Sequence, residues 1–164
     1  MASGNTLCMF FPQDNEPPSA AYATLDSRNG HPVLDFDDTT DESAIFTGVL
    51  PRHYAGGGIT VYLHVAFTSA TSAEARFDVA FERIGDSQQD IDSDGFATAG
   101  SVDITAPATS GHVEIGNVAF ADGAAIDSIA VGEAFRLKIT RDANHVNDDA
   151  SGDCELIAVE IKET

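Results

Sequence analysis

The amino-acid sequence predicts an all-β protein, an antiparallel jelly-roll-like β-sandwich of about eight or nine strands with an extended N-terminal arm. Hydrophobic residues alternate with polar residues in several segments, which is the period of a strand with one buried face. Glycine, proline, asparagine and aspartate separate these segments at short intervals. The 164 residues fit a single domain, and the absence of Trp argues against an immunoglobulin-type core.

The first predicted element of the sandwich is a β-hairpin within residues 22–36. Asn29-Gly30 stands at its centre, and this residue pair best tolerates the positive φ angles of a type I′ turn. Such a turn connects two antiparallel strands through only two residues. We therefore expect residues 22–27 to pair with residues 33–36.

The clearest strand patterns lie in the middle and at the end of the chain. Apolar residues take alternate positions in four segments, which are residues 59–68, 76–82, 135–140 and 157–161. In the last of these, Ile157, Val159 and Ile161 are the expected core residues. Within residues 113–120 the alternation shifts by one position around Gly116-Asn117, and a β-bulge there would restore a common buried face. Only residues 122–131 could hold a turn of helix.

The N-terminal segment predicts a separate arm over residues 1–18, followed by one sandwich domain over residues 19–164. This segment is apolar enough to bury and too rich in proline to join a central strand. On an isolated subunit such an arm has nothing to pack against, which favours a homo-oligomer. The residues expected to contact a capsid or a neighbouring subunit are Leu7, Met9, Phe10, Phe11, Pro12, Pro17 and Pro18.

The charge of the chain excludes two classes of partner. There are 27 acidic and 8 basic side chains, a formal net charge of −19. Without a basic stripe, the protein cannot displace counterions from nucleic acid or bind an anionic membrane surface. The first residues contain no Lys or Arg, and their apolar run is too short for a secretory signal. We therefore expect a protein made in the cytoplasm that keeps Cys8 and Cys154 as free thiols.

One local motif suggests a metal ion. Asp90, Asp92 and Asp94, followed by Gly95, match the first half of an oxygen-rich calcium loop. The second half is missing, because Ser101 stands where such a loop has a bidentate glutamate. Two interpretations therefore stay open: a calcium site formed by the three aspartates, and a solvated acidic hairpin loop.

The sequence predicts no enzyme and no catalytic residue. Its five histidines lack the spacing of metal ligands, and no Gly-x-Ser-x-Gly nucleophile elbow is present. Paired carboxylates could host glycosidase chemistry. Clefts for sugars also tend to carry aromatic platforms, however, and the chain has no Trp and only three Tyr.

Five stretches of the chain carry a resemblance to known proteins: residues 15–18, 22–26, 28–42, 135–137 and 159–164. In these stretches the chain resembles a family of small β-rich proteins from tailed-phage genomes and environmental viral sequence. The resemblance extends over nearly the whole chain from Pro12 onward. It implies a structural component of the virion, with capsid decoration, head spike and tail or fibre attachment all open, and it implies no active site.

Three functional hypotheses follow. The first is a homotrimeric capsid decoration or cement protein, located on the virion, with the major capsid protein or other virion proteins as partners. The second is a tail- or fibre-associated receptor-binding domain that binds host glycans through Tyr54, Gly56–Gly58 and Gly85–Gly95. The third is a calcium-dependent carbohydrate-binding module, against which the missing signal peptide and the missing Trp both count.

Overall fold

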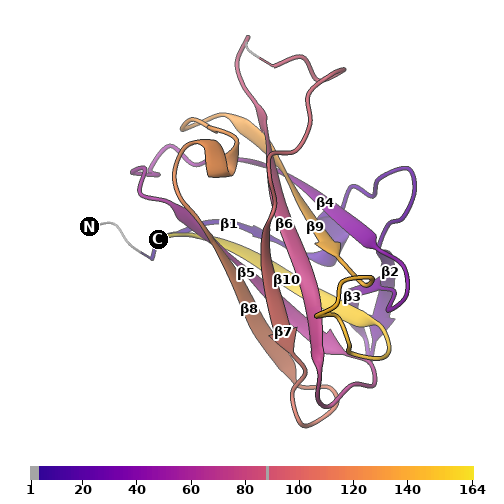
Figure 1. Ribbon diagram of the computed structural model, residues 1–164. Helices are drawn as coiled ribbons and strands as arrows, with labels where there is room; N and C mark the ends of the chain where they lie inside the picture. Colours follow the sequence, from indigo (N-terminus) through magenta and orange to yellow (C-terminus); the bar gives the residue numbers. More distant parts are fainter. Residues whose placement is uncertain (1–3, 88) are drawn as a thin grey trace.

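The computed structural model describes residues 4–87 and 89–164, which form two antiparallel sheets packed face to face (Figure 1). Sheet A has the strand order β2-β3-β10-β5-β8, and β1 also pairs with β10. Sheet B has the order β4-β9-β6-β7. This arrangement confirms the predicted antiparallel jelly-roll-like sandwich. Within the described ranges, no helix is both long enough and apolar enough to span a membrane.

The strands agree closely with the segments in which apolar and polar residues alternate. Sheet A contains β1 (Thr6–Phe10), β2 (Thr24–Arg28), β3 (His31–Phe36), β5 (Ile59–Phe67), β8 (Val113–Phe120) and β10 (Cys154–Glu163). Sheet B contains β4 (Glu42–Val49), β6 (Glu74–Ile84), β7 (Gly100–Thr105) and β9 (Ala134–Arg141). Two short 3₁₀ helices complete the described elements, η1 (Pro12–Asp14) and η2 (Ala124–Ile126), and η2 lies where the sequence could hold a helical turn.

The N-terminal hairpin forms as predicted. Asn29 and Gly30 have φ angles of 49° and 81°, the positive values that a type I′ turn requires. Arg28 and His31 face each other as the last pair before the turn. The hairpin therefore places the two side chains that flank its tip on the same face of sheet A.

Strand β10 is the centre of sheet A. Along one edge it pairs with β5 over nearly its whole length. Along the other edge it pairs first with β3, through Cys154, Glu155 and Leu156, and then with β1, from Val159 to Lys162. A single strand therefore connects the N-terminal segment, the hairpin and the middle of the chain.

The predicted bulge at Gly116-Asn117 is wrong. Strand β8 pairs with β5 in an unbroken register along its whole length. The apolar side chains of Val113 and Ile115 instead point to the outer face of sheet A, where they are 45% and 50% exposed. The shift in alternation therefore marks residues that leave the core, since no extra residue is inserted in the strand.

An irregularity is present in β10, where the sequence did not indicate one. The register with β5 shifts between Leu156 and Ala158. As a result Leu156 and Val159 both face the core, while Ile157 lies on the outer face and is only half-buried. The expectation that Ile157 is a core residue was therefore wrong, because a bulge resets the alternation of inward and outward side chains.

The predicted N-terminal arm is not separate from the sandwich in residues 6–10. These residues form β1, and Phe10 is buried and stacks on Phe46 with the ring centroids 5.3 Å apart. Leu7 is buried as well, whereas Met9 and Phe11 are 54% and 48% exposed. The physical reason is that β3 covers only the first part of β10, so the rest of that edge is available for pairing with β1.

The remainder of the segment lies along the free edge of sheet B. Pro12 is buried at the start of η1, whereas Pro17 is exposed and Pro18 half-buried. The Glu16 N–H donates to the Ile45 carbonyl oxygen of β4 at 2.7 Å. This contact protects an edge strand that would otherwise be open to pairing with another chain.

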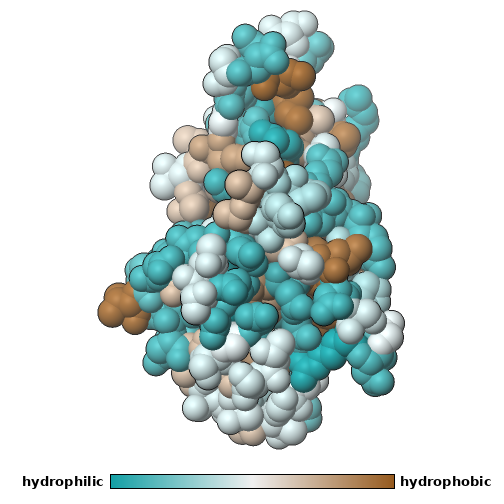
Figure 2. Space-filling model, turned by 90° about the vertical axis from the view of Figure 1, so that its right-hand side faces the viewer, coloured by the Kyte–Doolittle hydropathy of each residue, from teal (hydrophilic) through white to brown (hydrophobic). Residues whose placement is uncertain are grey.

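One side of the molecule is largely hydrophilic. Figure 2 shows the side of the molecule on which β2, β3 and the loop before β10 lie in Figure 1, and hydrophilic side chains cover most of it. Hydrophobic side chains form only small separate groups on this side. Ile91 and Val146 are the most exposed large apolar residues of the described chain, at 73% and 89%, and they lie in different loops.

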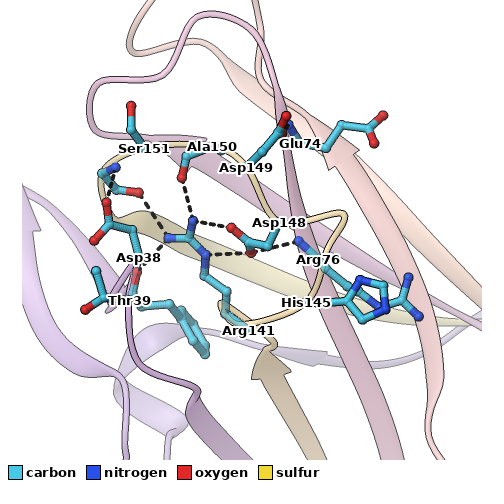
Figure 3. Close-up of polar contacts among 12 residues, drawn as sticks. Asp38, Thr39, Glu74, Arg76, Arg141, His145, Asp148, Asp149, Ala150 and Ser151 are labelled. Carbon is cyan, nitrogen blue, oxygen red and sulfur yellow. Dashed lines mark hydrogen bonds and ion pairs between the residues drawn. The ribbon is translucent and has the colours of Figure 1, made fainter.

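One end of the sandwich is held together by a buried arginine, Arg141 at the end of β9 (Figure 3). Its Nε and Nη2 atoms donate to the two carboxylate oxygens of Asp148 at 3.0 and 2.8 Å. The other N–H groups donate to the carbonyl oxygens of Phe36, Ala150 and Gly152 at 2.9 to 3.2 Å. All five guanidinium donors therefore have partners, and they join β9, the end of β3 and the 142–153 loop.

Replacing Arg141 with Ala is expected to lower the free energy of unfolding by about 3–5 kcal/mol. The physical reason is that the Asp148 side chain is only 1% exposed and would lose its counter-ion. Urea unfolding followed by circular dichroism measures the change. The control is Arg52→Ala, an exposed arginine, with an expected change of about 0.5 kcal/mol or less. Equal stability of the two variants would contradict this role of Arg141.

The position of β1 gives a second stability prediction, based on two adjacent residues. Phe10→Ala removes a buried ring and should cost about 3–5 kcal/mol of unfolding free energy. Met9→Ala, on the exposed side of the same strand, should cost less than about 1 kcal/mol. If both variants unfolded at the wild-type urea concentration, β1 would not belong to the folded unit.

Candidate binding groove on the outer face of sheet A

The outer face of sheet A contains a groove with a volume of about 450 Å³, named here the outer groove. Side chains from the β2–β3 hairpin line it on one side, and β8 with the loop before it lines the other. Strands β5 and β10 lie between them. The lining residues are Arg28, Asn29, His31, Val33, Ala66, Gly111, Val113, Glu155 and Ile157.

The composition of the outer groove is mixed. Val33, Ala66, Val113 and Ile157 supply an apolar lining, and they come from four different strands. The polar groups are gathered around the hairpin tip and β10. A largely apolar surface with a few fixed polar groups is the usual composition of a small-molecule site in a protein.

Arg28 is the polar centre of the outer groove. Its Nη1 atom donates to the Phe67 carbonyl oxygen at 3.1 Å and to the Glu155 carboxylate. Its Nη2 atom lies 3.5 Å from the Ser110 hydroxyl oxygen. These contacts hold the guanidinium across β5, β10 and the loop before β8. Glu155 is only 5% exposed, so one arginine neutralises a nearly buried carboxylate.

A second carboxylate, Asp35, lies next to this ion pair. It lies directly opposite Glu155 in the β3–β10 pairing, and like charges in such a pair destabilise a sheet. Its Oδ1 atom is buried and has no hydrogen-bond partner among the described residues. Burial, followed by the charges of Glu155, Asp26 and Asp153, raises the pKa of Asp35 to about 6. This carboxyl group therefore changes its charge in mildly acidic solution.

The same face continues beyond the outer groove along β5. His64 and Tyr62 follow Ala66 at intervals of two residues, so they lie on the same side of the sheet. They pair across to Ile115 and Asn117 of β8. Both side chains are half-buried. An aromatic ring, an imidazole and an amide thus extend the mixed surface away from the hairpin.

The glycan-contact surface predicted from sequence is wrong at Tyr54. This tyrosine is only 6% exposed, and its hydroxyl group donates to the Asp122 carboxylate at 3.0 Å. The Gly58 N–H in turn donates to the same hydroxyl oxygen at 3.3 Å. Tyr54 therefore fastens the β4–β5 loop to the chain after β8 and cannot serve as an exposed platform.

The structure does not bring Asp90, Asp92 and Asp94 together as calcium ligands. All three are exposed, and in the described part of the chain they do not form a group of three converging carboxylates. The Asp90 carboxylate accepts the Asp92 N–H at 3.1 Å, and the Asp94 carboxylate accepts the Gly95 N–H at 2.9 Å. These local bonds are typical of a solvated acidic loop.

A different trio of carboxylates does converge. Asp37, Asp38 and Asp153 are half-buried, and each offers one oxygen atom within 4.8 Å of the others. The Asp37 carboxylate accepts hydrogen bonds from the Thr39 hydroxyl group at 2.6 Å and from the N–H groups of Thr39 and Thr40, both at 2.8 Å. The hydroxyl contact, followed by the Thr39 N–H, lowers the pKa of Asp37. Asp38 accepts the Gly152 N–H at 2.6 Å, beside the Arg141 network. Backbone donors thus already stabilise two of these three charges.

No residue of the outer groove is among the site residues that the sequence analysis names. One signal was present: the shifted alternation around Gly116-Asn117 reflects Val113 and Ile115, two apolar residues that face outward. The pairing of Arg28 with Glu155 had no signal, since 127 positions separate them in the chain. Only the fold brings them together.

Comparison with known proteins gives structural likeness alone. No protein-family model matches the chain, and no curated protein matches it in sequence. The fold is similar to that of a family 35 carbohydrate-binding module from an environmental isolate, with 10% identity, a TM-score of 0.55, and 94% of this chain and 92% of the module covered. At this identity the likeness shows the fold, which agrees with the jelly-roll sandwich described above.

Two further solved structures have the same fold. One is the CBM22-1 xylan-binding domain of Xyn10C from Paenibacillus barcinonensis, with 12% identity, a TM-score of 0.51, and 99% of this chain and 96% of that domain covered. The other is the C-terminal CBM6 of LamC, a marine laminarinase from Zobellia galactanivorans, with 14% identity, a TM-score of 0.51, and 97% and 100% covered.

The position of Asp35 predicts how stability depends on pH. Its pKa is about 6 in the folded protein and about 4 in an unfolded chain, so the folded state binds this proton more tightly. The stabilisation from this group is therefore complete below about pH 4 and is lost as the pH rises to about 6. We expect Asp35→Asn to raise the melting temperature above pH 6 and to remove this component of the pH dependence.

Differential scanning calorimetry between pH 4 and pH 8 measures this effect. Asp94→Asn is the matched control, because it makes the same change of charge in an exposed loop. A melting temperature for Asp35→Asn that followed the wild-type curve at every pH would contradict the placement of Asp35 against Glu155.

Proposed function

We propose that this protein is a non-catalytic glycan-binding module and that the sugar binds in the outer groove. The observation that carries this proposal is the composition of the groove, an apolar lining from four strands around one fixed guanidinium. Sugars combine apolar C–H faces with hydroxyl groups. Val113 and Ile157 suit the former, and Arg28 and His31 suit the latter.

The structural neighbours support this proposal. Each of the three is a carbohydrate-binding module, and one is described as binding xylan. The match extends over nearly the full length of this chain in all three cases. Their low identity means that the ligand of any one of them does not transfer to this chain, so the proposal is limited to glycans as a class.

Glycan binding is common to the second and third of the sequence-based hypotheses, and the groove and the structural neighbours support it better than they support capsid decoration. The decoration hypothesis depends on an N-terminal arm that is available for docking. Leu7 and Phe10 of that arm are buried in this subunit, and among its described residues Met9 and Phe11 are the large apolar side chains that stay exposed. A location on the virion, a capsid partner, a homotrimer and the lack of catalysis remain predictions.

The proposal predicts that a charge placed in the outer groove abolishes binding. Val113→Asp puts a carboxylate against the apolar lining and should weaken glycan affinity at least tenfold, or by about 1.4 kcal/mol. Val131→Asp is the matched control, since Val131 is 44% exposed against 45% for Val113 and lies outside the groove. Both variants should keep the wild-type melting temperature, because neither residue is buried.

Affinity electrophoresis in gels containing neutral β-1,4-xylan, β-1,4-mannan or β-1,3-glucan is the first measurement, followed by calorimetric titration with oligosaccharides of the retarding polymer. Wild-type protein and Val131→Asp should be retarded by at least one of these polymers, and Val113→Asp should not. If no glycan retarded the wild type, or if Val113→Asp bound as tightly as the control, the proposal would be wrong.

A further inference from the structure

We propose that the outer groove selects uncharged glycans over anionic ones, and that Glu155 sets this selectivity by neutralising Arg28. This inference rests on the proposed function and adds a class of ligand and a specificity-determining residue to it. Three features of the groove support it: the ion pair, the carboxylates around it, and the donors that the guanidinium retains.

The first feature is that the positive charge of Arg28 is already used inside the protein. Its guanidinium contacts the Glu155 carboxylate, whose side chain is only 7% exposed. A nearly buried carboxylate needs its counter-ion, because an unpaired charge in such a position is strongly destabilising. Arg28 therefore cannot move away to pair with a carboxylate or sulfate group on a ligand without exposing Glu155 to that cost.

The second feature is the sign of the surrounding charge. Asp35 lies opposite Glu155, and the charges of Asp26 and Asp153 act on Asp35 as well. Among the lining residues, Arg28 and His31 are the ones that can carry a positive charge, and Arg28 is neutralised. An anionic ligand would therefore enter a region of net negative potential, on a protein whose total charge is −19.

The third feature is that neutralisation does not remove the hydrogen-bonding capacity of Arg28. A guanidinium has five N–H donors, and three of them have partners among the described residues, namely Phe67, Glu155 and Ser110. The remaining donors suit the hydroxyl oxygens of a neutral sugar. Arg28 thus acts as a fixed hydrogen-bond donor in the groove, and its formal charge does not attract anions.

The test replaces Glu155 with Gln, which keeps the size of the side chain and an acceptor oxygen for Arg28 but removes the negative charge. Wild-type protein should bind a neutral glycan at least tenfold more tightly than polygalacturonate. Glu155→Gln should bind polygalacturonate at least tenfold more tightly than the wild type does, with its affinity for the neutral glycan changed less than threefold. This gain should fall in 0.5 M NaCl, because salt screens an electrostatic attraction.

Glu160→Gln is the matched control. It makes the same change on the same strand, and Glu160 is outside the groove lining and bonded to the Thr6 hydroxyl group. This variant should keep the wild-type preference for neutral glycans. A second variant, Asp35→Asn, removes one negative charge without touching the ion pair. It should give a gain in polygalacturonate binding that is smaller than that of Glu155→Gln, and it provides the readout if Glu155→Gln does not fold.

The outcomes separate the two proposals. If the wild type bound none of the neutral glycans, the proposed function itself would fail. If the wild type bound neutral glycans and also bound polygalacturonate equally well, the function would stand and the selectivity would be refuted. The assignment to Glu155 would be refuted if folded Glu155→Gln showed no gain, or if Glu160→Gln showed the same gain. If Glu155→Gln did not fold, the absence of any gain in polygalacturonate binding by Asp35→Asn would also refute the assignment to Glu155.

Discussion

The fold depends on the pairing of one strand, β10, on both of its edges. Its backbone N–H and C=O groups lie in the middle of sheet A and need partners along their whole length. One edge is satisfied by β5, while the other is shared between the short strands β3 and β1. Because β3 pairs with only the first part of this edge, the N-terminal segment pairs with the rest as β1. Phe10 therefore lies in the core and packs against Phe46.

The same strand positions the outer groove. Glu155 lies in the part of β10 that pairs with β3, and Ile157, at the bulge two residues later, lies on the same outer face. Arg28 lies at the tip of the β2–β3 hairpin. Its contact with Glu155 connects this tip to β10 in the centre of the sheet. The groove is therefore a consequence of how β10 is paired, because residues 155–157 of this strand supply the carboxylate partner of Arg28 and part of the apolar lining.

The two arginine networks use charge in different ways. Arg141 is buried with all five donors satisfied, and its function is to hold loops and strand ends together at one end of the sandwich. Arg28 is partly exposed, at 33% of its side chain, and has donors left over. The acidic groups near both arginines offset their charge, which agrees with the proposed binding of an uncharged glycan through hydrogen bonds and apolar contacts.

The all-β class, most strand segments and the hairpin turn are predictable from the sequence, because strand periodicity and the φ preference of Asn29-Gly30 act locally. The alternation of apolar and polar residues identifies the two faces of a strand, but it does not show which apolar side chains lie on the outer face of the sheet. Only the tertiary structure placed Val113 and Ile157 on the outer face, Tyr54 against Asp122, and residues 6–10 in sheet A. The groove combines residues from the hairpin, β5, β8 and β10, and contacts between such distant segments leave no pattern in a single sequence.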